Sequence, residues 1–237
     1  MLTEQQNRQA KSRHDYQQPP FLIPTIDLHF ELDSGATIVT SVMQLRRQTA
    51  DAALKLDGQH LKLLRVLIDG TPLSAAQYEL NSESLTIPDV PDAFELKIVT
   101  QIAPVENTAL EGLYMAGNSY CTQCEAEGFR RISYFLDRPD VLSEYRVTVK
   151  ADASRYPYLL SNGNKIAEHI TADGCRIVQW HDPFPKPCYL FALVAGDLGV
   201  VEDTFVTMSE REVTLKIYVE HGKEPRAAYA MDALKRS

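Results

Sequence analysis

The stretch Cys121-Thr-Gln-Cys-Glu-Ala-Glu-Gly-Phe-Arg-Arg-Ile-Ser-Tyr-Phe-Leu-Asp-Arg-Pro139 stands at the centre of the chain and differs in character from the sequence on either side. Its first seven residues include two cysteines, two carboxylates and one amide, and two arginines and several large apolar residues follow. Much of the flanking sequence alternates between apolar and polar residues, as half-buried β-strands do, whereas this stretch does not. Polar side chains on an irregular segment of a β scaffold are common at binding sites, so we expect the functional site here.

The first hundred residues show the period of two that is typical of β-strands. Residues 26–32 alternate, a turn follows at Asp33-Ser-Gly35, and residues 24–46 are therefore predicted to form a β-hairpin. Shorter strands are predicted at residues 54–56, 61–68, 78–80, 85–87 and 94–98. Short strands separated by turn residues favour an antiparallel sandwich or a large curved sheet, so the fold class is mainly β.

The sequence around and after the central stretch predicts further strands and loops. Residues 107–119 contain no regular pattern and are interpreted as an irregular loop. Beyond residue 139 the expected elements are a strand at 145–149, a hairpin turn at 161–164, a strand at 176–180, a rigid loop at 181–188 and an apolar strand at 189–194. Three prolines fix φ in the loop at 181–188, and the unbroken apolar run after it indicates burial on both faces.

The C-terminal forty residues differ from the rest. Residues 213–219 alternate, Pro225 stands at a first helical position, and residues 226–235 predict a helix. This pattern is interpreted as the beginning of another domain that is cut off at Ser237. At the other end, residues 1–20 are polar and lack the apolar region of a secretory signal, so they are interpreted as a loose tail.

Composition limits the classes of partner. The formal net charge is −8, which argues against nucleic acid, because nucleic-acid modules carry a basic face. A cationic ligand fits this sign better. No apolar run approaches the length of a membrane span, so no membrane partner is expected. Four cysteines without a secretory signal indicate a reducing, cytoplasmic setting.

The four cysteines allow more than one interpretation. Cys121 and Cys124 have the spacing of redox or metal-ligating pairs. A closed zinc site would need two further ligands, but Cys175 and Cys188 are thirteen residues apart and form no second close pair. A thioredoxin-type motif would need a helix N-terminus, and the context here is β. We interpret the cysteines as packed free thiols, and a cysteine-dependent metal or redox protein stays as an alternative.

Several runs in this order resemble one family. The central stretch, the run Asn107-Thr-Ala-Leu-Glu-Gly-Leu-Tyr114 and the run Trp180-His-Asp-Pro-Phe-Pro-Lys-Pro-Cys-Tyr-Leu-Phe-Ala-Leu-Val-Ala-Gly-Asp197 resemble the gammaproteobacterial aminopeptidase N family, which consists of zinc metallo-aminopeptidases of the gluzincin type. The resemblance extends from about His14 to the last residue. It implies a saddle-like, mostly antiparallel β domain over residues 1–197, followed at 198–237 by the first strands and helix of a truncated, thermolysin-like catalytic domain.

The resemblance also implies an activity and two substrate-binding residues. Family members hydrolyse peptides with the help of Zn²⁺ and release the first amino acid. On this template the carboxylate of Glu125 binds the free α-amino group of a peptide substrate, and Gln123 lines the pocket for the first side chain. Glu127 is a weaker candidate for a second contact, and a salt bridge from it to Arg130 or Arg131 is the preferred interpretation.

The chain departs from the family at the catalytic motif. The zinc motif H-E-x-x-H is absent, because none of the six histidines has another four residues away, and the peptide-binding signature G-A-M-E-N is absent as well. No catalytic or metal-binding residue is therefore expected in this chain, and no zinc is expected to bind it. We expect it to need the remainder of the same enzyme chain and to be inactive alone. The alternative is a stand-alone β-rich binding module without catalysis.

Overall fold

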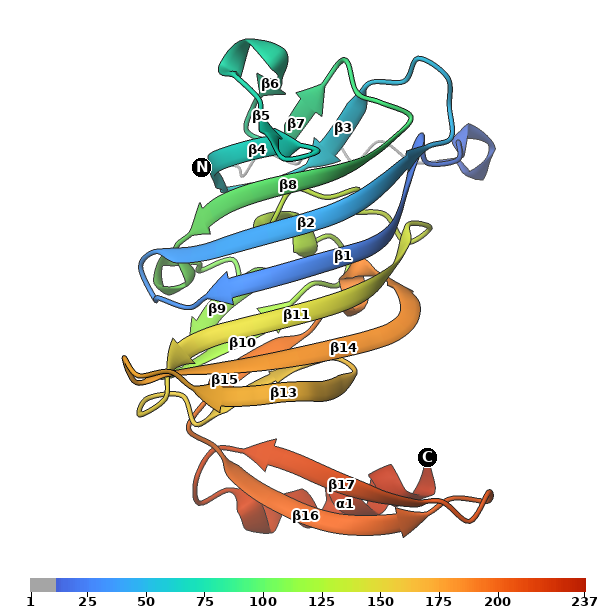
Figure 1. Cartoon of the computed structure of the whole chain (residues 1–237). Coiled ribbons are helices and arrows are strands. Elements are labelled where there is room, and N and C mark those ends of the chain that lie inside the picture. The colour runs from blue at the N-terminus through green and yellow to red at the C-terminus, as the bar shows by residue number, and fades with distance from the viewer. Residues whose placement is uncertain (1–11) are drawn as a thin grey trace, which may run out of the picture.

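The computed structural model describes residues 12–237, and strands dominate it (Figure 1). The strands are β1 (Phe21–Glu31), β2 (Thr37–Arg47), β3 (Leu54–Asp57), β4 (Lys62–Ile68), β5 (Thr71–Pro72), β6 (Glu79–Leu80), β7 (Ser84–Ile87), β8 (Ala93–Ile102), β9 (Gly112–Ala116), β10 (Ser119–Gln123), β11 (Leu142–Asp152), β12 (Tyr158–Ser161), β13 (Asn164–Ile170), β14 (Cys175–Pro187), β15 (Leu193–Gly196), β16 (Gly199–Val206) and β17 (Glu212–Val219). The helical elements are the 3₁₀ turns η1 (Arg13–Asp15), η2 (Ala75–Gln77), η3 (Pro104–Glu106), η4 (Phe129–Arg131), η5 (Cys188–Leu190) and η6 (Glu224–Arg226), and the α-helix α1 (Ala227–Arg236).

A large twisted sheet forms the frame of the molecule. Its eight strands have the order β13-β14-β11-β1-β2-β8-β4-β5, and all neighbours are antiparallel except β1 and β11, which run parallel. The predicted hairpin at residues 24–46 is confirmed as β1 and β2, paired from Phe21↔Arg47 to Glu31↔Ile38. The mainly β fold class is confirmed with it. Alternation was a reliable signal here because one face of this sheet is buried and the other is not.

A second sheet lies behind the first and covers its buried face (Figure 1). It has the order β12-β15-β10-β9. Side chains from β1 point into the space between the sheets, and the ring of Phe30 stacks on that of Phe191 at a centroid distance of 5.9 Å. The central stretch fills much of this space, since Phe129 and Phe135 are fully buried. The irregular segment is therefore held from both sides by the two sheets.

Two regular strands lie where the sequence predicted irregular structure. Residues 107–119 contain β9, and the central stretch begins inside β10, which pairs with β9 from Ser119↔Ala116 to Gln123↔Gly112. Only residues 107–111 form the expected loop, which the side chain of Asn107 closes by donating to the carbonyl oxygens of Glu111 (2.7 Å) and Leu113 (2.9 Å). A strand of five residues beginning with glycine is too short to show alternation.

The turn at residues 161–164 does not form the predicted hairpin. β12 belongs to the four-stranded sheet and β13 to the eight-stranded sheet, so the turn carries the chain from one layer to the other. Gly163 has a φ of +81°, and a Cβ there would lie 2.3 Å from the carbonyl oxygen of His181. Glycine is needed both for the backbone conformation and for this close approach.

The proline-rich segment at residues 181–188 is also different from its prediction. Instead of a loop, β14 continues through it and pairs with β11 as far as Leu142↔Pro187. Pairing of β14 with β13 ends at His181, so beyond that residue β14 has a neighbour on one side only. The register with β11 shifts between Lys186 and Asp182, so Pro183 and Pro185 lie in a bulge where no ladder partner needs an N–H from them. A strand with one free side tolerates these missing donors.

The apolar run at residues 189–194 is not one strand buried on both faces. η5 covers its beginning, β15 starts at Leu193, and Leu190 is exposed. Between η5 and β15 the backbone bonds to the side chain of Asn162 and not to a neighbouring strand. This side chain donates to the carbonyl oxygen of Leu190 (3.2 Å) and accepts from the N–H of Ala192 (2.7 Å). These contacts come from a residue 28 positions before Leu190, so the apolar run itself contains no signal for them.

The C-terminal residues form a two-stranded sheet of their own with a helix packed on it. β16 and β17 pair from Gly199↔Val219 to Val206↔Glu212, and α1 packs on this hairpin through the buried residues Ala227 and Met231. The predicted helix at residues 226–235 is thereby confirmed to within one residue. In residues 12–237 no helix is both long and apolar enough to cross a bilayer.

The polar N-terminal segment is only partly described. Residues 1–11 of the expected tail lie outside the described residues. Residues 16–20 contact the β domain: the hydroxyl of Tyr16 donates to Asp140 (3.0 Å), Arg138 donates to the carbonyl oxygen of Gln17 (2.7 Å), and Pro19 is buried. This part of the tail is therefore attached, contrary to its interpretation as loose.

Histidine 29 on β1 gives the fold a testable pH dependence. Burial lowers the pKa of His29 from its ordinary value of 6.5, so the unfolded chain binds a proton more readily than the folded chain. The contribution of His29 to the free energy of unfolding is therefore constant above pH 6.5. It decreases as the pH falls from 6.5 towards the folded-state pKa. We expect His29→Gln to lose less stability than the parent chain between pH 7 and pH 5, measured by urea unfolding. An equal loss in both proteins would contradict this role.

Candidate functional site

The two candidate residues of the site are positioned by the end of β10. Tyr120 and Cys121 pair with β15 through their backbones, and at Thr122 the side chain binds β15 instead. The hydroxyl of Thr122 donates to the carbonyl oxygen of Leu193 (3.1 Å) and accepts from its N–H (2.8 Å). The chain leaves the sheet after Gln123, so the residues that follow project beyond the strand end.

A tight turn follows at residues 124–128. The N–H of Gly128 donates to the carbonyl oxygen of Cys124 at 2.8 Å. A Cβ at Gly128 would lie 2.4 Å from the carbonyl oxygen of Gln123, so only glycine allows the turn to close this tightly. Cys124 points into the core, and Glu125 lies at the surface of the turn. The peptide bond between Glu125 and Ala126 is cis.

Glu125 and Gln123 are brought together by this turn. The side-chain amide of Gln123 donates to the backbone carbonyl oxygen of Glu125 at 3.0 Å, which ties the two residues to each other. Both side chains are exposed. Within residues 12–237 the carboxylate of Glu125 has no hydrogen-bond or ion-pair partner in the structure, so it is available to an external donor or cation. Neither residue lines one of the pockets described for this chain.

Glu127 lies on the other side of the turn and faces an arginine. Its carboxylate lies 3.4 Å from a terminal guanidinium nitrogen of Arg130. The preferred interpretation of Glu127 as an ion-pair partner of Arg130 agrees with this geometry. Arg131 pairs instead with Glu111, at 3.2 Å from its Nε.

A buried carboxylate lies beneath the turn. Oδ2 of Asp137 accepts from the backbone N–H of Arg130 (3.1 Å) and from its Nε (2.9 Å), and the Asp137 side chain is 1% exposed. Oδ1 accepts from the thiol of Cys188 at 3.0 Å. A buried carboxylate is stable only with such partners, and here both of its oxygens are occupied.

Asp57 connects this group to a distant part of the chain. Its carboxylate accepts from the backbone N–H of Asp137 at 3.1 Å, and the backbones of Asp57 and Phe135 exchange two hydrogen bonds (2.8 and 3.1 Å). Burial raises the pKa of the Asp57 carboxyl group above its ordinary value. No sequence signal links Asp57 to Asp137, because the two residues are 80 positions apart and the contact depends on the tertiary fold.

Two of the four cysteines, Cys124 and Cys188, have the surroundings of packed thiols, whereas Cys121 and Cys175 are partly exposed. Burial raises the pKa of Cys124 to about 12, and burial together with the neighbouring Asp137 raises the pKa of Cys188 further still. All four cysteines are free. A thiol with a raised pKa is a poor nucleophile, because the thiolate is the reactive form. Among the residues from 12 onward, no three histidine, cysteine or acidic side chains are grouped so that they could hold a metal ion.

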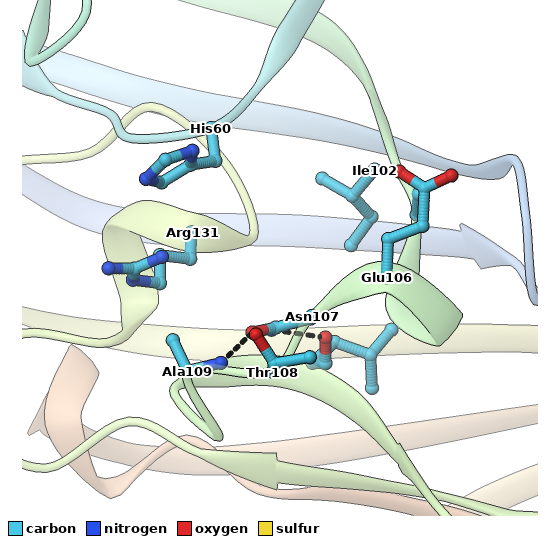
Figure 2. Close-up of a pocket in the computed structure, with 9 residues that line it drawn as sticks. His60, Ile102, Glu106, Asn107, Thr108, Ala109 and Arg131 are labelled. Atoms are coloured by element: carbon cyan, nitrogen blue, oxygen red, sulfur yellow. Dashed lines mark hydrogen bonds between the residues drawn. The ribbon is translucent and has the colours of Figure 1, made fainter.

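A pocket of about 460 Å³ lies next to η4 but apart from Glu125. Figure 2 shows His60 and Arg131 on one side of it, Ile102 and Glu106 on another, and residues 107–109 along its floor. Its charged groups have both signs. Sequence reasoning did not identify this pocket, since its walls come from three separate parts of the chain.

Comparisons with known proteins agree with the fold and extend over nearly the whole chain. Residues 21–190 match the model of the Peptidase M1 N-terminal domain family. The chain is 53% identical to aminopeptidase N of Escherichia coli (strain K12) over 233 residues, which cover 98% of this chain and 27% of that protein. The chain thus spans about a quarter of the length of this relative.

Solved structures give the same assignment. The crystal structure of Legionella pneumophila aminopeptidase A in complex with aspartic acid superposes with a TM-score of 0.90 at 32% identity and covers 95% of this chain and 27% of that one. An M1 zinc metallopeptidase of Deinococcus radiodurans bound to a Tyr-Ser-Ala substrate has a TM-score of 0.72 at 14% identity, covers 86% and 48% of the two chains, and supports the fold alone. By its sequence match and its fold, this chain belongs to the Peptidase M1 N-terminal domain family.

Proposed function

We propose that this chain is the N-terminal part of a zinc aminopeptidase, in which Glu125 binds the free α-amino group of a peptide and Gln123 lines the pocket for its first side chain. The observation that carries the proposal is the 53% identity to an aminopeptidase N over 98% of the chain. Within the part of the chain that the structure describes, the carboxylate of Glu125 is exposed and unpaired on a tight turn, which supports the amine-binding role.

The chemistry of the amine fits a carboxylate. A peptide's α-ammonium group is a cation with three donors, and a carboxylate accepts charge-assisted hydrogen bonds from it. At a separation of about 4 Å and an effective dielectric constant of about 20, the attraction is about 4 kcal/mol before desolvation is subtracted. An acylated N-terminus offers no positive charge to Glu125. Selectivity for the first residue of a peptide would follow from this one contact.

Zinc is proposed for the complete enzyme and not for this chain. The described residues do not fit a zinc centre, because no group of potential ligands is close enough together in residues 12–237. Zn²⁺ and its ligands are proposed to come from the remainder of the same protein, which also completes the substrate site. We further propose a cytoplasmic location.

N-terminal acetylation of the substrate tests the proposed activity. In the complete protein encoded by the reading frame that contains this chain, we expect release of amino acids from free-amine peptides and no release from their N-acetylated forms. The 237-residue chain alone is expected to release nothing from aminoacyl p-nitroanilides, with or without added zinc.

Two outcomes of this experiment would contradict the proposal. Turnover by the isolated chain that a chelator abolishes would place a catalytic centre within it. A complete protein that binds peptides but releases no amino acid would favour the alternative of a stand-alone β-rich binding module.

A further inference from the structure

We propose that Arg130, held by the buried carboxylate of Asp137, is a positioning residue that fixes the turn carrying Glu125. This inference rests on the proposed amine-binding function of Glu125. It adds a group that does not touch the substrate but determines where the amine-binding carboxylate lies.

Arg130 is attached to Asp137 by several hydrogen bonds. Three donors of Arg130 reach this one residue: the backbone N–H and Nε bind Oδ2, and a terminal nitrogen binds the backbone carbonyl oxygen at 3.3 Å. The Arg130 side chain is only 15% exposed, so water does not compete strongly for these bonds. A planar guanidinium with several donors in a fixed geometry suits such an arrangement, and a lysine ammonium does not.

Asp137 is itself held in place by several partners. Its Oδ1 accepts from Cys188, its N–H donates to Asp57, and the carbonyl oxygen of Arg130 accepts from the N–H of Gln59 at 2.9 Å. Asp57 is the last residue of β3, Cys188 is the first residue of η5, and Arg130 lies in η4. Asp137 is therefore connected to three separated parts of the β domain.

Arg130 also contacts the turn that carries Glu125. A terminal guanidinium nitrogen of Arg130 lies 3.4 Å from the carboxylate of Glu127, three residues earlier, and the N–H of Gly128 closes the turn by donating to Cys124 at 2.8 Å. At the other end, β10 holds Gln123 in the sheet. Since both ends of residues 123–130 are fixed, the backbone at Glu125 has little freedom. A side chain on a fixed backbone loses less conformational entropy on binding than one on a mobile loop.

A stabilising role without positioning makes a different prediction. If the Arg130–Asp137 pair only held the domain together, its loss would reduce the folded fraction and would weaken all ligands equally. A positioning role weakens only those ligands that use Glu125. The ratio of affinities for a ligand with an α-amine and the same ligand without it therefore separates the two roles.

The experiment uses a charge-conserving pair of neighbouring substitutions in the complete protein. Arg130→Lys keeps the charge but cannot reproduce the three contacts with Asp137. Arg131→Lys is the matched control, because this neighbour is similarly buried, at 19% exposed, and pairs only with Glu111 among the described carboxylates. Dissociation constants for L-leucine and for 4-methylpentanoate, its analogue without the amine, are measured by calorimetry.

We expect Arg130→Lys to raise the dissociation constant for L-leucine about tenfold and that for 4-methylpentanoate less than twofold. Arg131→Lys is expected to change neither dissociation constant by more than twofold. Equal weakening of both ligands by Arg130→Lys, or an unchanged ratio, would overturn the inference. If Arg130→Lys does not fold, Asp137→Asn replaces it, because this change keeps Arg130 and the shape of the buried side chain but removes the charge that Nε of Arg130 binds. The same selective weakening of L-leucine binding is then expected, and an unchanged ratio overturns the inference. Glu125→Gln is measured in parallel. If it leaves the ratio of the two dissociation constants unchanged, the proposed function of Glu125 fails. If Glu125→Gln changes this ratio but Arg130→Lys does not, only the positioning role of Arg130 is contradicted.

Discussion

Replacing Glu125 by glutamine in the complete protein is expected to lower kcat/KM for free-amine peptides at least a hundredfold. This ratio corresponds to about 2.7 kcal/mol of transition-state stabilisation. Glutamine keeps the size and one acceptor oxygen of the side chain but removes the negative charge that attracts the α-ammonium group. The measurement is the steady-state hydrolysis of an aminoacyl p-nitroanilide by parent and variant.

A second exposed glutamate provides the control for this substitution. Glu111 lies in the loop before β9, is 53% exposed and pairs with Arg131, so Glu111→Gln removes one charge from the same region without touching the turn. We expect its kcat/KM to stay within threefold of the parent. If Glu125→Gln also stays within threefold, Glu125 has no role in binding the amine.

Replacing Phe129 by alanine is expected to lower the free energy of unfolding of the chain by about 3–5 kcal/mol. Phe129 is fully buried, and its ring lies 5.2 Å from Phe135, 5.5 Å from Phe191 and 6.4 Å from Tyr145, measured between centroids. These rings come from the central stretch, β11 and the segment before β15, so the cavity would open where the two sheets meet. Urea unfolding followed by tyrosine fluorescence or circular dichroism measures the loss.

Phe184 supplies the matched substitution for this experiment. It is the same residue type in β14 but is 75% exposed, and Phe184→Ala is expected to change stability by less than about 0.5 kcal/mol. A loss at Phe129 no larger than at Phe184 would mean that the central stretch contributes little to the core.

The fold could be predicted from the sequence where burial is one-sided and local. β1 and β2 alternate because one face of the large sheet is covered, and a turn of Asp33-Ser-Gly35 joins them. Predictions failed where a distant group decides the conformation. Asn162 interrupts the apolar run at residues 189–194, and β11 keeps the proline-rich segment extended. Neither effect has a local signature.

The candidate site shows the same division. Resemblance to a family pointed to Gln123 and Glu125, and the structure places them together at the end of β10. The supporting group beneath them was not found, because Asp57, Asp137 and Cys188 are far apart in sequence and have no shared motif. The sequence around Asp137 contains no pattern that marks this residue as buried. Its burial and its role as an acceptor for Arg130 depend on the packing of both sheets.

The parallel pairing of β1 with β11 has a consequence for biosynthesis. Thr25 pairs with Glu144 and Glu31 with Lys150, so the middle of the large sheet joins segments about 120 residues apart. While a ribosome synthesises the chain from its N-terminus, β1 and β2 emerge early but one edge of β1 stays open until β11 has emerged. An open strand edge is prone to pair with other chains, so a nascent chain stalled before residue 142 should associate with chaperones more strongly than one stalled after residue 187.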